Sequence, residues 1–90
     1  MRFEWDADKE RGSRQKHGVS FHEAATVFTD PFTLIAPDVF YAERFTILGI
    51  SSRSRLLFVV YAEKHHGETI RIISARRATR AEREAYEEEG

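Results

Sequence analysis

The chain has 90 residues and no cysteine, is 41% hydrophobic and 32% charged, and carries a formal net charge of −1. This length suits one small domain over residues 1–90, and the lack of cysteine excludes a disulfide framework, a thiolate zinc site and a cysteine nucleophile. The longest apolar run, Leu56 to Ala62, is far shorter than the ~20 residues of a membrane-spanning helix. Because acidic residues stand near the N-terminus, where a secretory signal is apolar, we expect a cytoplasmic protein.

Basic and acidic residues are placed unevenly along the chain. Residues 53–83 hold eight bases against three acids, and residues 84–90 hold four acids and no base. Eleven of the fourteen bases are arginine, whose planar guanidinium binds phosphate bidentately where lysine offers a point charge. The pattern favours a phosphate-binding surface, although a genomic bias toward arginine codons would explain the arginine content equally well.

The first third of the chain predicts a strand followed by two helices. Residues 2–5 alternate polar and aromatic, as in a strand with one buried face. Asp6 can cap a helix that ends at Gly18, the residue type that best accepts a left-handed conformation. Ser20 and Glu23 form a capping box for a second helix, in which each side chain can satisfy the other's backbone amide. Asp-Pro at positions 30 and 31 ends that helix.

The rest of the chain predicts a sheet and a last helix. The segments with the composition of β-strands are Phe32–Ala36, Val39–Ala42, Phe45–Ile50, Arg55–Glu63 and Thr69–Ala75. The last two are apolar at nearly every position, so we expect them at the centre of the sheet. Thr79 and Glu82 form a second capping box, opening a C-terminal helix with few apolar residues. The five segments are counted as four strands in the expected order, β-α-α-β-β-β-β-α. This order predicts an α+β fold in which helices pack on an antiparallel sheet.

Two stretches carry more than composition. They are Lys16-His17-Gly18-Val19-Ser20-Phe21 leading into Ala24 to Phe28, and Arg71 to Arg80 leading into Glu82, Arg83 and Tyr86. Together with Trp5-Asp6 and Asp30-Pro31, they resemble the BrnT family across nearly the whole chain. Three positions depart from the family. Ser13 and Arg14 replace an asparagine and an aliphatic residue, and Arg77 stands where lysine is frequent.

The resemblance implies a function, a fold and a partner. Members of the BrnT family are bacterial ribonuclease toxins of type II toxin-antitoxin systems with a RelE-like fold. The resemblance therefore implies a metal-independent endoribonuclease that cleaves RNA and inhibits translation, with no cofactor. It also implies a BrnA-like ribbon-helix-helix antitoxin as partner. We assign DNA binding to that antitoxin, because nothing in this chain resembles a DNA-reading motif.

RNA cleavage by transfer to the 2′-hydroxyl needs a base, an acid for the leaving oxygen, and donors for the charge on the phosphate. The expected catalytic donors are Arg76, Arg80 and Arg83, and the expected RNA-binding residues are Arg44, Arg53, Arg77 and Tyr86. Arg80 and Arg83 share a face near a helix N-terminus, which itself favours phosphate. The alternatives are ion pairs with Glu84 and Glu87 on a solvated face, and a tyrosine that merely covers the sheet.

Proton transfer has five candidates on sequence grounds: Lys16, His17, Glu63, His65 and His66. The resemblance favours Lys16 and His17 as catalytic residues. The alternative for both is an interaction with the last carbonyl groups of their helix, beside its C-terminal glycine. The histidines lack the spacing and acidic partners of a metal site, so no metal ion is expected.

A different class of function stays open. The chain could be a noncatalytic module that binds a protein partner or single-stranded nucleic acid through its arginine-rich surface. A binder weakens by degrees when single residues are lost, whereas an active site can lose most of its rate. If the antitoxin reading holds, an acidic or amphipathic antitoxin segment should cover the arginine cluster, and an unpaired sheet edge would offer it strand docking.

Overall fold

The computed structural model describes residues 1–89. Its elements are β1 (Arg2–Trp5), α1 (Ala7–His17), α2 (Phe21–Thr26), the short 3-10 helix η1 (Val27–Thr29), β2 (Leu34–Pro37), β3 (Arg44–Ile50), β4 (Leu56–Lys64), β5 (Thr69–Arg77) and α3 (Arg80–Glu89). This confirms the α+β class and the predicted order of strands and helices. None of the helices within this range is long and apolar enough to cross a membrane.

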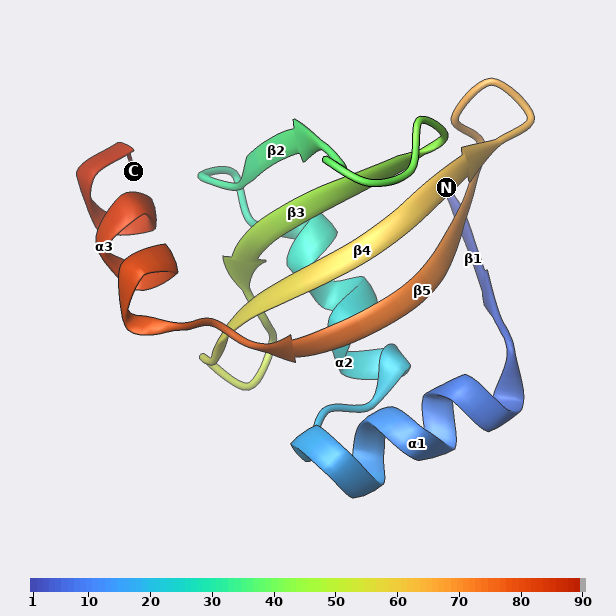
Figure 1. The fold of residues 1–90 in the computed structure, drawn as a ribbon, viewed down its shortest axis with the longest axis horizontal. Coiled ribbons are helices and arrows are strands. Elements are labelled where there is room, and N and C mark those ends of the chain that lie inside the picture. Colours follow the sequence, from blue (N-terminus) through green and yellow to red (C-terminus); the bar gives the residue numbers. More distant parts are fainter. Residues whose placement is uncertain (90) are drawn as a thin grey trace.

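The five strands form one sheet in the order β1-β5-β4-β3-β2 (Figure 1). Strands β2 to β5 pair antiparallel with one another. β4 and β5, the two strands expected at the centre, both lie in the interior of the sheet. The edge strand β1 instead runs parallel to β5, so the sheet is mixed where an antiparallel one was expected. The reason is topological. β1 and β5 stand at opposite ends of the chain, and no hairpin sets their relative direction.

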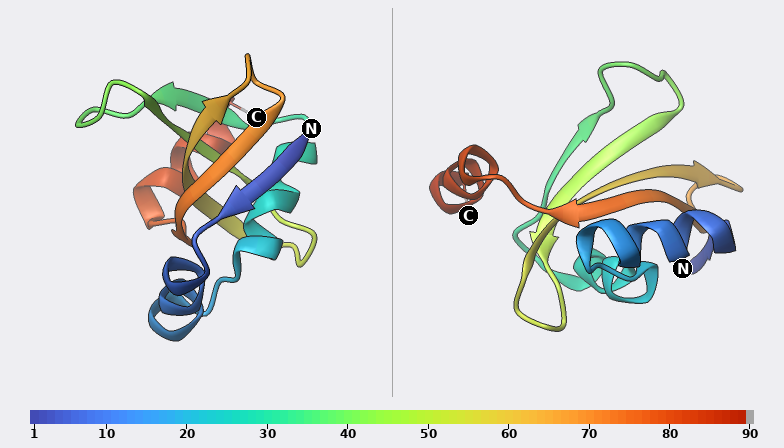
Figure 2. Two further views of the ribbon diagram at one scale, coloured as in Figure 1. Left: turned by 90° about the vertical axis from the view of Figure 1, so that its right-hand side faces the viewer. Right: turned by 60° about the horizontal axis from the view of Figure 1, so that its bottom comes forward.

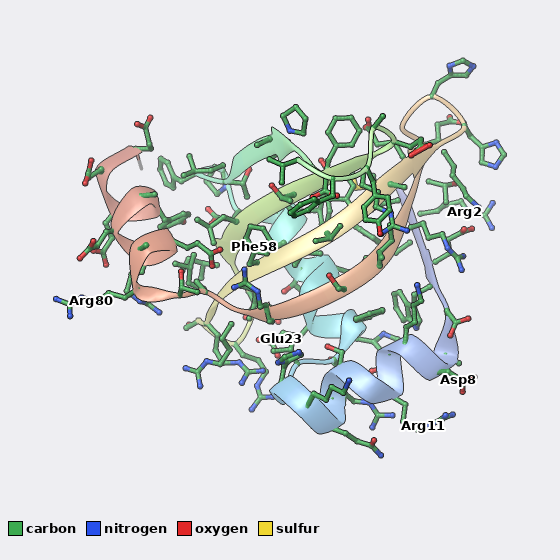
Figure 3. All side chains as sticks on the ribbon, in the orientation of Figure 1. Arg2, Asp8, Arg11, Glu23, Phe58 and Arg80 are labelled. Carbon is green, nitrogen blue, oxygen red and sulfur yellow. The ribbon has the colours of Figure 1, made fainter. Side chains whose placement is uncertain are left out.

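The hydrophobic core lies between α2 and one face of the sheet (Figure 2). Its members are Val19, Phe21, Ala24, Val27, Ile47, Leu57, Val59, Tyr61, Ile70, Ile72 and Ala75. Because side chains alternate along a strand, the residues between these, such as Phe58 and Val60, face the other side. We call that side the open face. Figure 3 shows Phe58 on it, with no helix in front.

α1 attaches to the sheet through polar contacts. Asp6 caps it, accepting from the amides of Asp8 and Lys9 at 2.9 and 3.0 Å, and Gly18 ends it at φ 68°, as predicted. Ser13 is buried, and its Oγ lies 2.8 Å from the carbonyl oxygen of Val19 and 3.0 Å from that of Ala75 on β5. Ser13, although it departs from the family pattern, therefore anchors α1 to the sheet by hydrogen bonds.

The expected strand at Val39–Ala42 is wrong. This segment forms the loop between β2 and β3, and all four of its residues are exposed. The loop closes through the amide of Asp38, which donates to the carbonyl oxygen of Arg44 at 2.9 Å. The apolar composition suited a strand, but no neighbouring strand is present for it to pair with.

The capping box at Ser20 forms only in part. Ser20 Oγ accepts from the amide of Glu23 at 3.0 Å, but the Glu23 carboxylate turns away from the backbone. It binds Arg55 and Ser51 instead. At α3 the box is reciprocal. Thr79 donates its amide to Glu82 at 2.9 Å, and the amide of Glu82 donates to the Thr79 hydroxyl at 3.2 Å.

Candidate active site

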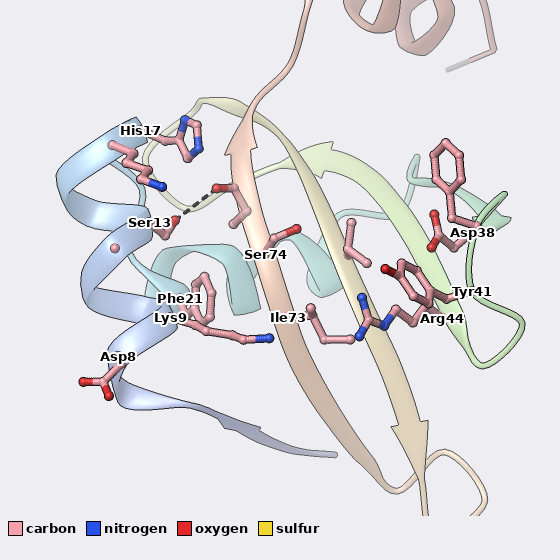
Figure 4. A pocket seen from close by; sticks show the side chains of 15 residues that line it. Asp8, Lys9, Ser13, His17, Phe21, Asp38, Tyr41, Arg44, Ile73 and Ser74 are labelled. Atoms are coloured by element: carbon pink, nitrogen blue, oxygen red, sulfur yellow. Dashed lines mark hydrogen bonds between the residues drawn. The ribbon is translucent and has the colours of Figure 1, made fainter.

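A groove of about 660 Å³ crosses the open face between α1 and the β2–β3 loop (Figure 4). Its first wall is α1, its floor is β4 and β5, and its second wall is the loop and the start of β3. The lining includes Lys9, Ser13, Lys16 and His17 on α1, Val60, Ile73 and Ser74 on the floor, and Asp38, Phe40, Tyr41 and Arg44 on the second wall. The floor of the groove is thus mostly apolar, and both of its walls carry charged side chains.

The α1 wall presents cations that have no ion-pair partner within residues 1–89. Lys9 and Lys16 are seven residues apart, two turns of helix, so they lie on one face together with Ser13 between them. Lys9, Lys16 and His17 are all exposed. The two arginines of α1 are held elsewhere, since Arg11 pairs with Asp8 at 2.8 Å and Arg14 with Glu10 at 2.9 Å.

The opposite wall presents Arg44, which the loop holds in place. Its guanidinium carbon lies 4.1 Å from the centre of the Tyr41 ring, a cation–π contact, and its amide donates to the Tyr41 carbonyl oxygen at 3.1 Å. Figure 4 shows Lys9 and Arg44 reaching into the groove from opposite walls, with Ile73 between them. An anion lying there would meet a cation on each side.

Among the predicted site residues, the groove brings together Lys16, His17 and Arg44. Arg76 and Arg77 end β5, outside the groove. Arg76 binds the Glu82 carboxylate with two hydrogen bonds of 2.9 Å, and its guanidinium lies 4.3 Å from the centre of the Phe58 ring. Its charge is therefore shared with an acid.

The remaining predicted arginines and the tyrosine lie beyond the groove. Arg80 is 93% exposed and points away from the sheet (Figure 3). It lies 3.6 Å from Glu84, so the helical ion pair that the sequence left open is formed. Arg83 is exposed on the same helix. Tyr86 donates its hydroxyl to Asp30 at 2.6 Å and so fastens α3. Arg53 is 69% exposed in the β3–β4 turn, 4.0 Å from Glu23.

The other three candidates for proton transfer lie at the β4–β5 turn. Glu63, His65 and His66 are exposed there, and none of them lines the groove. Both histidines have left-handed backbones, with φ of 53° and 56°. Within residues 1–89, no three His, Asp or Glu side chains gather closely enough to hold a metal ion.

Comparison with known proteins identifies the family. The family model described as the ribonuclease toxin BrnT of type II toxin-antitoxin systems matches residues 5–82. The chain belongs to the BrnT family. Its fold is similar to that of the Brucella abortus ribonuclease toxin BrnT in a crystal structure, with a TM-score of 0.71 and 22% identity over 89% of this chain and 99% of that one. No curated protein matches the chain. The predicted family is thereby confirmed, and a type II toxin has an antitoxin as its partner.

For this BrnT-family chain, the groove adds residues that the sequence did not single out. Lys9 was detectable, because it stands two helical turns before Lys16 on a helix whose ends were predicted correctly. Ser74 and Tyr41 were not. Ser74 enters the floor through an irregularity in the pairing of β4 with β5, and Tyr41 lies in the segment wrongly expected to be a strand.

Proposed function

We propose that this protein acts in the cytoplasm as a metal-independent endoribonuclease that cleaves RNA in the groove and so inhibits translation. A BrnA-like ribbon-helix-helix antitoxin neutralises it and carries any DNA binding. The observation behind the proposal is the meeting of Lys16 and His17 on α1 with Arg44 on β3, across an apolar floor. Groups for proton transfer and for phosphate binding thus lie around one space.

The chemistry follows from the roles that these side chains can take. The phosphate lies in the groove between α1 and Arg44, whose charge, together with that of Lys9, stabilises the negative charge that grows on the phosphate oxygens. His17 takes the proton of the 2′-hydroxyl, and the 2′-oxygen forms a bond to phosphorus. The bond from phosphorus to the 5′-oxygen breaks, and Lys16 protonates the leaving oxygen. The products are a 2′,3′-cyclic phosphate and a 5′-hydroxyl, and no metal ion is needed.

The arginines outside the groove are proposed to bind the flanking RNA. In the register of the sheet, Phe58 pairs with Arg76, and Val60 pairs with Ser74, so the Arg76 pair lies about 7 Å farther along the open face than the groove floor. An RNA strand leaving the groove along β5 would then reach Arg77, which was expected to bind RNA, and Arg80 and Arg83, which were expected to be catalytic donors. In this proposal all three bind flanking phosphates. Arg53 would serve in the same way from the β3–β4 turn.

The test is cleavage of a long synthetic RNA by purified protein in excess chelator. His17→Asn should lower the rate roughly 100- to 10,000-fold, the usual contribution of a proton-transfer group. The matched control is His66→Asn, which changes an exposed histidine outside the groove and keeps a residue that tolerates a left-handed backbone. It should cleave at the wild-type rate. Loss of wild-type activity in chelator would refute metal independence.

A second pair of measurements separates catalysis from mere binding. Arg44→Ala should lower cleavage roughly 100-fold or more, as expected for a donor to the reacting phosphate. Only a moderate loss of RNA affinity should accompany it. If instead His17→Asn and Arg44→Ala both cleave at the wild-type rate, and RNA affinity weakens by degrees with each arginine removed, the noncatalytic binding module is the better account.

A further inference from the structure

The exposed apolar side chains of this chain are concentrated at one edge of the sheet. Apart from Met1, all the large hydrophobic residues that are exposed within residues 1–89 lie between positions 32 and 41. They are Phe32 (57% exposed), Ile35 (58%), Val39 (85%), Phe40 (85%) and Tyr41 (53%). We call this set the β2 patch. Apolar side chains gathered in this way mark a surface that a partner covers.

The strand beneath the patch, β2, is also a free edge of the sheet. β2 pairs with β3 on one side and has no strand on its other side within the described chain. Leu34 to Pro37 include no charged residue, one of the features that keep edge strands from pairing with other chains. Pro37 at the end of the strand has no amide to donate, so a paired segment would bond mainly along Leu34 to Ala36. The opposite edge is different. On β1, Glu4 is held by Lys64 and Arg71, each at 3.0 Å.

The charges around the patch favour a protein over RNA as its occupant. Asp38 and Glu43 are the charged residues from position 32 to 43, so the patch has no cation for a phosphate backbone. The neighbouring groove has an excess of positive charge, with Lys9, Lys16 and Arg44 in its lining against Asp8 and Asp38. The two surfaces are continuous, because Phe40 and Tyr41 belong to both. A partner segment bound along β2 can therefore continue across the β2–β3 loop into the groove.

We propose that the antitoxin docks by adding an extended apolar segment to the outer edge of β2, and that acidic residues next to that segment enter the groove. Backbone hydrogen bonds to β2 and apolar contacts with the patch supply affinity. The acidic residues meet Lys9, Lys16 and Arg44 and exclude RNA. The blocking of activity rests on the proposed function, since it takes the groove as the active site, whereas the docking on β2 does not.

The deciding variants are Ile35→Lys and Ile35→Glu, both outside the groove. Each places a charge in the apolar contact, so both should weaken the binding of the purified cognate antitoxin, by roughly tenfold or more. If RNA used this edge, the two charges would act in opposite directions. Ile35→Val keeps the apolar contact and should bind as the wild type does. Arg2→Ala, on the opposite edge, should also leave affinity unchanged.

Two readouts report on the mode of docking. In hydrogen exchange, saturating antitoxin should slow the amides of β2 and leave those of β1 at their rates in the free protein. Without antitoxin, the Ile35 variants should cleave RNA at the wild-type rate, which also shows that they are folded. Were the protein unable to cleave RNA at all, the affinity and exchange measurements would still decide the docking site.

Three results would overturn the inference. The first is wild-type antitoxin affinity in both charged variants, with β2 amides that exchange freely in the complex. The second is a dimer of the free toxin that both Ile35 variants convert to a monomer, with antitoxin affinity unchanged. That result would show that the β2 edge binds a second copy of this chain. The third is RNA binding in the free toxin that Ile35→Lys strengthens and Ile35→Glu weakens, while antitoxin affinity is unchanged.

Discussion

α2 and α3 are both short helices attached to the same sheet, and they are held in opposite ways. α2 buries Phe21, Glu23 and Ala24 against the core. α3 has no buried residue and is fastened at its side chains, by the Arg76–Glu82 pair and by the hydroxyl of Tyr86. Local opening costs least where little apolar surface is buried. The contacts of α2 therefore contribute most to the stability of the fold, and α3 can detach while the sheet stays folded.

The strongest polar contact on the α2 side is the buried carboxylate of Glu23. Its side chain is 4% exposed, and it accepts from Ser51 Oγ at 2.6 Å and from Arg55 Nε at 2.9 Å, while Arg55 Nη2 also binds it closely. The same Nη2 donates to the carbonyl oxygen of Gly18 at 2.9 Å. This cluster joins the α1–α2 junction to the β3–β4 turn.

Arg55→Ala should have the largest effect, a loss of about 3 kcal/mol in the free energy of unfolding, because it leaves the Glu23 carboxylate buried without its partner. Urea denaturation measures it. Arg53→Ala is the matched control, since Arg53 is 69% exposed and 4.0 Å from the same carboxylate, and it should change stability by less than about 1 kcal/mol. Equal losses in the two variants would contradict the role given to the buried pair.

The second prediction concerns acid. The Arg55 hydrogen bonds hold the pKa of Glu23 below its ordinary value, although burial opposes them. A carboxylate with a lowered folded-state pKa stabilises the fold above its unfolded pKa, and this stability is lost as pH falls through the folded value. The free energy of unfolding should therefore decrease as pH falls below 4.5, the ordinary pKa of this carboxyl, and through its lower folded-state pKa. Glu23→Gln should show a smaller decrease, and a slope identical to the wild type would refute the assignment.

The two capping boxes show what the sequence could predict and what it could not. Thr79 and Glu82 satisfy each other as expected, because both partners lie within one turn of helix. The same motif at Ser20 fails on one side because Glu23 finds Arg55, 32 residues away, and that contact depends on the assembled fold. Local signals therefore placed the helix starts and the end of α1 correctly. They did not show that α2 ends at Thr26 and continues as a 3-10 turn to Thr29, and they could not choose among distant partners.

The candidate site divides in the same manner. Lys16 and His17 were predicted, and their helix brings them to the groove. The arginines after Arg76 are neighbours in sequence, yet Arg76 turns to Glu82 and Phe58 while Arg80 points to solvent. Clustering along the chain predicted one phosphate site. In the fold these side chains lie outside the groove. β5 carries Arg76 beyond the groove floor, and α3 begins only after the end of β5.

The third prediction tests how α3 is fastened. Burial and the hydrogen bond to Asp30 raise the pKa of Tyr86 to about 12, so its hydroxyl stays a donor at neutral pH, and the contact is lost only as pH rises through that value. Tyr86→Phe removes the donor and should weaken the docking of α3 by about 1 kcal/mol. Hydrogen exchange should then quicken roughly fivefold in α3 alone. Equal quickening in the core strands would show that α3 opens only with the whole fold.

Arg80→Ala should have the smallest effect on stability. It therefore separates a role of α3 in RNA binding from a role in folding. Arg80 is 93% exposed, and its partner Glu84 is 61% exposed at 3.6 Å, so solvent screens the pair and its loss should change the free energy of unfolding by less than about 0.5 kcal/mol. If Arg80 contacts a phosphate, the slope of log affinity for single-stranded RNA against log salt should become shallower by about 0.7. A changed salt slope at unchanged stability would give α3 a binding role without a folding role. An unchanged slope would remove Arg80 from the proposed RNA path, and a large loss of stability would contradict the weak attachment of α3 itself.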